Sequence, residues 1–178
     1  LIAAAVTEGK LKVNGIDPKI IKTEIDILKK IGAKITLDKN QITILGNKII
    51  KNINLKTAPY PGFPTDLQAQ LMVLLCKAKK YSVITEEIFE NRFMHVAELR
   101  RLGAKITIKR NKAIIEGPSE FTGAELMSSD LRASVALVLA AIVAKGHSVI
   151  NRIYHLDRGY EKIENKLKKV GAKIRRVN

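Results

Sequence analysis

The sequence has no tryptophan and a single cysteine, and aromatic residues make up only 4% of its 178 residues. One cysteine cannot form an internal disulfide, which suits a reducing compartment. No apolar run reaches the roughly 18 residues that a membrane helix needs, and no signal peptide pattern is present. We therefore expect a cytoplasmic protein with no membrane partner, whose core is filled by Ile, Leu, Val and Ala.

Positive charge exceeds negative charge, because 32 Lys and Arg residues stand against 17 Asp and Glu residues and give a net charge of +15. Such an excess suggests anionic partners, such as nucleic acid, acidic lipid or phosphorylated metabolites. Most of the lysines are scattered over amphipathic stretches, however, where they make a solvated helix face. No Lys/Arg-rich run carries interleaved aromatic residues, so we expect no nucleic-acid partner. A basic module that binds nucleic acid or another anion remains the alternative function.

A phrase ending in Gly-Ala-Lys occurs three times, with its glycine at positions 32, 103 and 171. Each copy follows an amphipathic, helix-like stretch and precedes β-branched residues, which indicates a helix stop and a strand start. Spacings of 71 and 68 residues predict a fold built from repeated supersecondary units. Three β-α-β-α-β-β units can bury helices against sheets around a shared axis, so we expect one α/β domain over residues 1–178.

The expected units cover approximately residues 1–50, 51–120 and 121–178, and the first is cut short at its N-terminus. In the second unit, we expect a helix at 65–79 that is capped by Thr65 or Asp66. It is followed by a strand at 81–85, a helix at 92–102 and a hairpin of strands at 104–108 and 113–116. In the first unit they are a strand at 10–13, a helix at 18–31 and a hairpin turn at 38–41. In the third they are a helix at 130–144, a strand at 148–151, a helix at 159–170 and one final strand. Strands at 53–56 and 124–127 lead into the second and third units.

Charged residues distinguish the loops that precede the helices. The second and third units place Asp66 and Asp130 where a helix begins, and an N-cap role is the simple interpretation of either residue. Arg92, Arg132 and Arg158 lie at expected helix starts, where the helix dipole disfavours a cation. Arg supplies a planar fork for phosphate or carboxylate. We therefore expect the three arginines and two aspartates to converge on one face.

Five segments together carry a family resemblance, namely 57–59 (TAP), 63–70 (FPTDLQAQ), 89–95 (FENRFMH), 129–134 (SDLRAS) and 152–161 (RIYHLDRGYE). They resemble the UDP-N-acetylglucosamine 1-carboxyvinyltransferases, enolpyruvyl transferases of the first committed step of peptidoglycan synthesis. The resemblance implies an enolpyruvyl-transferase-like inside-out α/β barrel. It implies the C-terminal domain of a two-domain enzyme, whose missing N-terminal domain is a partner and carries the mobile-loop catalytic residue. It also implies that this piece alone is inactive.

The resemblance also assigns roles to single residues. Asp66 matches the carboxylate that binds the sugar 3-hydroxyl and takes its proton, and Ile88 matches a backbone contact to the UDP-sugar. Arg132 and Arg158 match clamps for phosphoenolpyruvate, and Arg92 is a supporting basic residue. Asp130 matches a carboxylate near the methylene carbon of phosphoenolpyruvate. The implied substrates are UDP-N-acetylglucosamine and phosphoenolpyruvate.

Other reactive side chains receive plainer interpretations. Cys76 lies within an apolar run and is expected in the core. His95 and Glu98 share a helix face, but two candidate ligands do not make a metal site, so we expect neither a metal nor a cofactor. His155 is expected to support the loop of Arg158. Besides the transferase and the basic module, a purely structural fragment that binds neither substrate remains possible.

Overall fold

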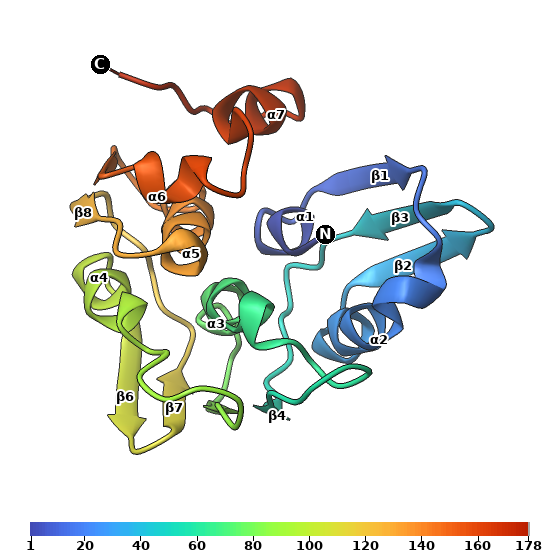
Figure 1. Cartoon of the computed structure of the whole chain (residues 1–178), viewed down its shortest axis with the longest axis horizontal. Helices are drawn as coiled ribbons and strands as arrows, with labels where there is room; N and C mark the ends of the chain where they lie inside the picture. The colour runs from blue at the N-terminus through green and yellow to red at the C-terminus, as the bar shows by residue number, and fades with distance from the viewer. Residues whose placement is uncertain (178) are drawn as a thin grey trace.

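The computed structural model describes residues 1–177 (Figure 1). The helices are α1 (Ile2–Val6), α2 (Lys22–Ile31), α3 (Gln68–Leu75), α4 (His95–Arg101), α5 (Leu131–Ile142), α6 (Tyr154–Asp157) and α7 (Ile163–Lys169), with 3₁₀ turns η1 (Pro18–Ile21) and η2 (Thr65–Leu67). The strands are β1 (Lys10–Asn14), β2 (Lys34–Asp38), β3 (Gln41–Leu45), β4 (Asn54–Lys56), β5 (Ser82–Thr85), β6 (Lys105–Lys109), β7 (Lys112–Glu116), β8 (Glu125–Met127) and β9 (Val149–Asn151). No helix in residues 1–177 has the length and apolar character to cross a bilayer.

Three separate sheets form the outside of the fold, in the orders β1-β3-β2, β4-β5-β7-β6 and β8-β9. The hairpins β2–β3 and β6–β7 are antiparallel with two-residue turns, since Asp38 pairs with Gln41 and Lys109 pairs with Lys112. The pairs β4–β5 and β8–β9 are parallel, and a helix connects the two strands of each pair. The predicted strands between residues 10 and 151 are confirmed to within one residue at each end.

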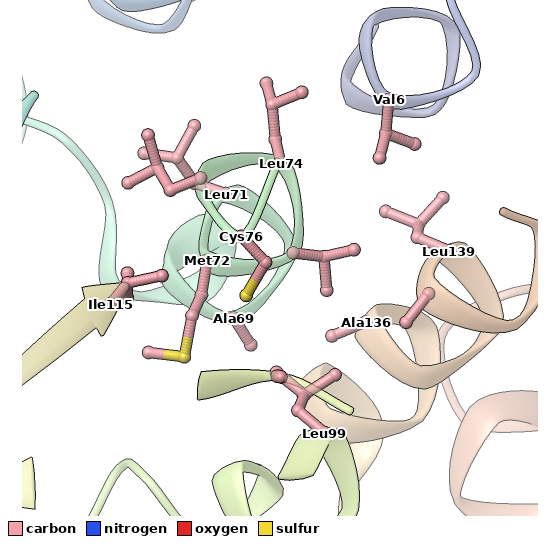
Figure 2. Packing of buried hydrophobic residues seen from close by; sticks show 14 of the residues in the cluster. Val6, Ala69, Leu71, Met72, Leu74, Cys76, Leu99, Ile115, Ala136 and Leu139 are labelled. Atoms are coloured by element: carbon pink, nitrogen blue, oxygen red, sulfur yellow. The ribbon is translucent and has the colours of Figure 1, made fainter. Parts of the chain in front are cut away.

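Helices α3 and α5 occupy the inside. Every residue of α3 is buried, as are residues 133–140 of α5, and a helix that is apolar on all sides must be covered on all sides. Helix α3 contacts both α1 and α5, and it lies below these two helices in the view of Figure 1. Figure 2 shows Val6 of α1, Leu99 of α4, Ile115 of β7 and Leu139 of α5 around the side chains of α3. The predicted arrangement, with helices inside and sheets outside, is confirmed.

The Gly-Ala-Lys phrase has the role that the sequence predicts. Gly32, Gly103 and Gly171 all have positive φ, at 118°, 103° and 101°. In the first two copies the following strands, β2 and β6, begin at the Lys of the phrase. The next backbone amide, that of Ala33 or Ala104, donates back into the last helical turn and completes the helix stop.

Three predicted helices are clearly shorter than expected, and one of them, predicted at 92–102, begins only at His95 and ends at Arg101. The helix predicted at 65–79 starts as a 3₁₀ turn and ends at Leu75, because the amides of Lys77 and Ala78 bond three residues back instead of four. The helix predicted at 159–170 begins only at Ile163, because Lys162 has a left-handed φ of 44°. The short helix α6 precedes it and buries Leu156 against Val135 and Val138 of α5.

The final strand predicted for the third unit is wrong as far as residue 177, and Asn178 lies outside the described residues. Residues 172–177 have no ladder partner within the described chain, whereas β2 and β6 each pair with the next strand of a hairpin. An extended segment gains sheet hydrogen bonds only from a neighbouring strand. Among residues 1–177, only the second unit therefore shows the full β-α-β-α-β-β order.

Two glycine variants test the role of the repeated phrase. An added Cβ at Gly103 would lie 2.7 Å from the carbonyl oxygen of Glu120, whereas one at Gly171 meets nothing within 4 Å. Both substitutions place alanine in a sparsely allowed conformation, which costs about 1–3 kcal/mol. We expect Gly103→Ala to lower the free energy of unfolding, measured by urea denaturation, by clearly more than Gly171→Ala. Equal losses would contradict the close approach at Gly103.

Candidate active site

A cavity of about 370 Å³ lies where the starts of three helical segments meet. It is lined by residues of η2 and α3, of the loop before α4, and of the first turn of α5. Helix α5 packs against both α3 and α4, which brings these segments together although they are far apart in sequence. Charged and polar residues of the lining include Thr65, Gln68, Arg92, His95, Asp130 and Arg132.

Asp130 is the N-cap of α5, as the sequence predicts. Its backbone is extended, and its Oδ1 accepts hydrogen bonds from the backbone amides of Arg132 at 2.8 Å and Ala133 at 3.0 Å. The hydroxyl of Ser129 donates to Oδ2 at 3.3 Å. The cap fixes the carboxylate in the wall of the cavity, so Asp130 presents negative charge there in a defined orientation.

Asp66 has a different role from the predicted cap. The residue before η2 is Pro64, which provides no side-chain cap, and Oδ1 of Asp66 instead accepts from Nε of Arg132 at 2.5 Å. Asp66 is the more exposed partner, with 62% of its side-chain surface accessible against 35% for Arg132. The pair links η2 to α5 and places a carboxylate beside a guanidinium at the start of α5. That carboxylate offsets the unfavourable position of Arg132 relative to the helix dipole.

Arg92 lies in the loop before α4 and also lines the cavity. Its guanidinium carbon stands 4.2 Å from the centre of the Phe89 ring, within the range of a cation–π contact. Asn91, between them, has a φ of 55°, a conformation that Asn tolerates better than most residues. The exposed Phe89 ring thus serves as a support on which the guanidinium of Arg92 rests.

Three of the six predicted site residues line the cavity, a fourth bonds to one of them, and Ile88 and Arg158 do neither. Asp130, Arg132 and Arg92 line it, and Asp66 bonds to Arg132. Ile88 precedes Arg92 in the same loop, and its amide bonds to Glu86.

Arg158 ends α6 instead of starting a helix, which corrects the sequence prediction. The next residue, Gly159, is so close to Leu131 that an added Cβ would lie 2.8 Å from a Leu131 methyl carbon. The backbone next to Arg158 therefore approaches the start of α5. The contact is with Leu131, which lies between Asp130 and Arg132 in the sequence.

Sequence reasoning missed the burial of His95 in the cavity wall. His95 is 3% exposed, and burial lowers its pKa from 6.5 to about 4, although the nearby charge of Asp130 acts in the opposite direction. Its Nε2 and the Nε2 of Gln68 have no hydrogen-bond partner in the described chain. No sequence pattern around His95 or Gln68 indicates that the side chain is buried. The burial of His95 becomes visible only in the structure, where α4 packs against α5.

The remaining candidates behave as structural residues. Cys76 is fully buried, and burial raises the pKa of its thiol to about 12, which confirms the core assignment. Glu98 accepts from the backbone amide of Met127 at 2.9 Å and forms no site with His95. Within residues 1–177, no group of three or more His, Cys, Asp or Glu side chains is placed to hold a metal ion.

The N-cap role of Asp130 can be separated from any chemical role. Asp130→Ala removes the acceptor for two backbone amides and is expected to lower the free energy of unfolding by about 1 kcal/mol. Asp130→Asn keeps an oxygen at the same place, so we expect it to lower the free energy of unfolding by only a few tenths of the loss in Asp130→Ala. Urea denaturation of both variants measures the difference. Equal destabilisation by Asn and Ala would contradict the cap.

Burial of His95 makes stability depend on pH. Since the folded pKa lies below the unfolded value, the unfolded chain binds more protons between pH 6.5 and 4. The stabilisation is thus complete above about pH 6.5 and is lost as the pH falls towards 4. We expect His95→Phe to reduce this loss, measured as the free energy of unfolding against pH. The same substitution at the exposed His147 is the control, and equal pH dependence in both variants would contradict the assignment.

Comparison with known proteins agrees with this architecture. Residues 1–167 match the family model described as EPSP synthase (3-phosphoshikimate 1-carboxyvinyltransferase). The chain is also similar to two proteins named UDP-N-acetylglucosamine 1-carboxyvinyltransferase. It is 75% identical to the one from Pelagibacter ubique over the whole chain and 43% of that relative's length. It is 52% identical to the one named with the suffix 1 from Clostridium acetobutylicum, over 99% of the chain and 42% of the relative. The chain thus spans less than half the length of these relatives.

Solved structures show the same fold. The enolpyruvyl transferase NikO from Streptomyces tendae superposes with a TM-score of 0.89 at 28% identity, over 98% of this chain and 42% of that one. An EPSP synthase from Acinetobacter baumannii superposes with a TM-score of 0.79 at 20% identity, over 99% of this chain and 45% of that one. The resemblance drawn from five sequence segments is confirmed by the names of the curated relatives. The chain belongs to the EPSP synthase (3-phosphoshikimate 1-carboxyvinyltransferase) family and has the enolpyruvyl transferase fold.

Proposed function

We propose that this chain forms one wall of the active site of a UDP-N-acetylglucosamine 1-carboxyvinyltransferase. The reaction transfers the enolpyruvyl group of phosphoenolpyruvate to the 3-hydroxyl of UDP-N-acetylglucosamine and releases phosphate. The observation that carries the proposal is the cavity at which Arg92, Arg132 and Asp130 meet, with Asp66 bonded to Arg132. The names of relatives that are 75% and 52% identical support this substrate pair.

The chemistry requires a base, a cationic clamp and a second carboxylate. The carboxylate of Asp66 takes the proton of the sugar hydroxyl, whose oxygen then bonds to C2 of phosphoenolpyruvate while C3 gains a proton. Loss of a proton from C3 then expels phosphate and restores the double bond. Arg132, Arg158 and Arg92 stabilise the phosphate and carboxylate charges through both steps. Asp130, fixed by its capping bonds, lies on the side of the methylene carbon.

The biological setting follows from the substrates. The product is a precursor of peptidoglycan, so the reaction contributes to cell wall biogenesis and through it to cell shape and division. A cytoplasmic location fits the buried free thiol of Cys76 and the use of a nucleotide sugar. The partner implied by the coverage of the relatives is a second domain, which supplies the other wall of the site.

A chimera tests the proposal. The matched segment of the Pelagibacter ubique relative is replaced by this chain, and phosphate release is measured with both substrates present. We expect turnover that falls about 100-fold or more in Arg132→Ala, because a fixed charge that stabilises the transition state is lost. Arg101→Ala, which removes an exposed arginine at the end of α4, is the matched control and leaves turnover unchanged.

Besides a chimera without any turnover, two results would overturn the proposal. One is a chimera whose phosphate release is unaffected by Arg132→Ala and by Asp66→Asn. The other is phosphate release by the 178-residue chain alone, since the proposal requires a second wall. Nucleic-acid binding that weakens steeply with salt and is indifferent to Arg158→Ala would favour the basic module instead.

A further inference from the structure

A buried carboxylate that the proposed reaction does not use joins the two loops beside the cavity. Glu86 follows β5 directly and is only 3% exposed. Its Oε1 accepts hydrogen bonds from the hydroxyl of Thr57 at 2.9 Å and from the amides of Ile88 at 2.9 Å and Phe89 at 3.2 Å. Its Oε2 accepts from the hydroxyl of Thr65 at 2.8 Å. One side chain thus bonds to both the 57–65 loop and the 87–92 loop.

The backbone of Glu86 is held as firmly as its side chain. Its amide donates to the carbonyl of Asn111 at 2.8 Å, and the side-chain amide of Asn111 donates to the carbonyl of Glu86 at 3.1 Å. Asn111 lies in the turn between β6 and β7, so the carboxylate is anchored to the rigid hairpin. Glu86 therefore holds the two loops in a fixed position relative to the sheet.

The charge of Glu86 is compensated by neutral donors alone. In residues 1–177, no Lys, Arg or His side chain lies within ion-pair distance of it. Burying a carboxylate is costly unless hydrogen bonds replace its water, and hydrogen bonds to a charged acceptor are stronger than neutral ones. The four donors are consequently held in the arrangement that the carboxylate dictates. A neutral linker would hold them less tightly.

Three of the four donors belong to or adjoin the residues of the proposed site. Thr65 immediately precedes Asp66, which bonds to Arg132. The amides of Ile88 and Phe89 begin the loop in which the Phe89 ring supports Arg92. We propose that Glu86 is a positioning residue, which holds the loops carrying Asp66 and Ile88 in the shape that receives the UDP-sugar before any substrate binds. The proposal rests on the proposed function for the identity of that ligand.

Amide hydrogen exchange of the 178-residue chain tests the positioning without any substrate. In Glu86→Ala the amides of Ile88 and Phe89 lose their acceptor, and we expect them to exchange about tenfold faster. Glu86→Gln retains an oxygen for these amides and offers its NH₂ to the Thr65 hydroxyl, so their exchange stays within about threefold of the original. Glu87→Gln is the matched control, because Glu87 is the adjacent residue and pairs with the exposed Lys56. Unchanged exchange in Glu86→Ala would overturn the proposal.

Kinetics of the chimera test whether Glu86 positions the loops for binding of the UDP-sugar. We expect Glu86→Ala to raise the KM for the UDP-sugar about tenfold, with a smaller change in the KM for phosphoenolpyruvate, and Glu86→Gln to restore most of the loss. Ile42→Ala removes a buried side chain of β3, a strand that belongs to another sheet than Glu86 and its loops, and is expected to leave both constants unchanged. Equal increases in both KM values, or an equal effect of Ile42→Ala, would overturn the positioning role. A chimera without any turnover would refute the proposed function, while the exchange experiment would still decide whether Glu86 fixes the loops.

Discussion

Complete burial of the central helices is the constraint on which the other features depend. Helix α3 and the middle of α5 have no solvent-facing side, so sheets and other helices must surround them. Polar side chains can then emerge only at the ends of these helices. The starts of α3 and α5 lie side by side with the loop before α4, and the cavity forms at that junction. Its location is therefore a consequence of how the core is packed.

Charge at this junction is tolerated because each charged group has a nearby partner. Arg132 stands in the first turn of α5, where a cation is disfavoured, but the carboxylate of Asp66 bonds to it. Asp130 accepts two amide bonds as a cap, Arg92 rests on an aromatic ring, and Glu86 receives four neutral donors. Arg132, which conflicts with the local helix dipole, is thus stabilised by a contact with a different repeat unit, a pattern expected of a functional site.

Local sequence signals predicted the strands, the helix stops and the identity of most charged site residues, and longer-range packing decided the rest. The turn residues and β-branched runs placed every strand up to residue 151, because those signals are local. The prediction failed at Lys162, whose left-handed conformation no residue pattern announces, and at residues 172–177, which lack a strand to pair with. Asp66 resembled a cap in sequence, yet its partner is 66 residues away. Glu86 drew no attention, and His95 was weighed only as a metal ligand, because burial arises only in the folded chain.

The strength of the Asp66–Arg132 pair bears on the roles that we propose for both residues. An ion pair between partly exposed side chains contributes about 0–1 kcal/mol, because water solvates the separated charges nearly as well. In the proposed reaction, a phosphate or carboxylate ligand can therefore replace Asp66 on Arg132 at little cost, which frees the carboxylate for its proposed role as the base. The hydrogen bonds of Glu86 are harder to break, because its carboxylate is buried. Breaking them would leave buried donors and a buried carboxylate without hydrogen-bond partners. The proposed site thus combines a weak, exchangeable ion pair beside the cavity with fixed contacts in the loops next to it.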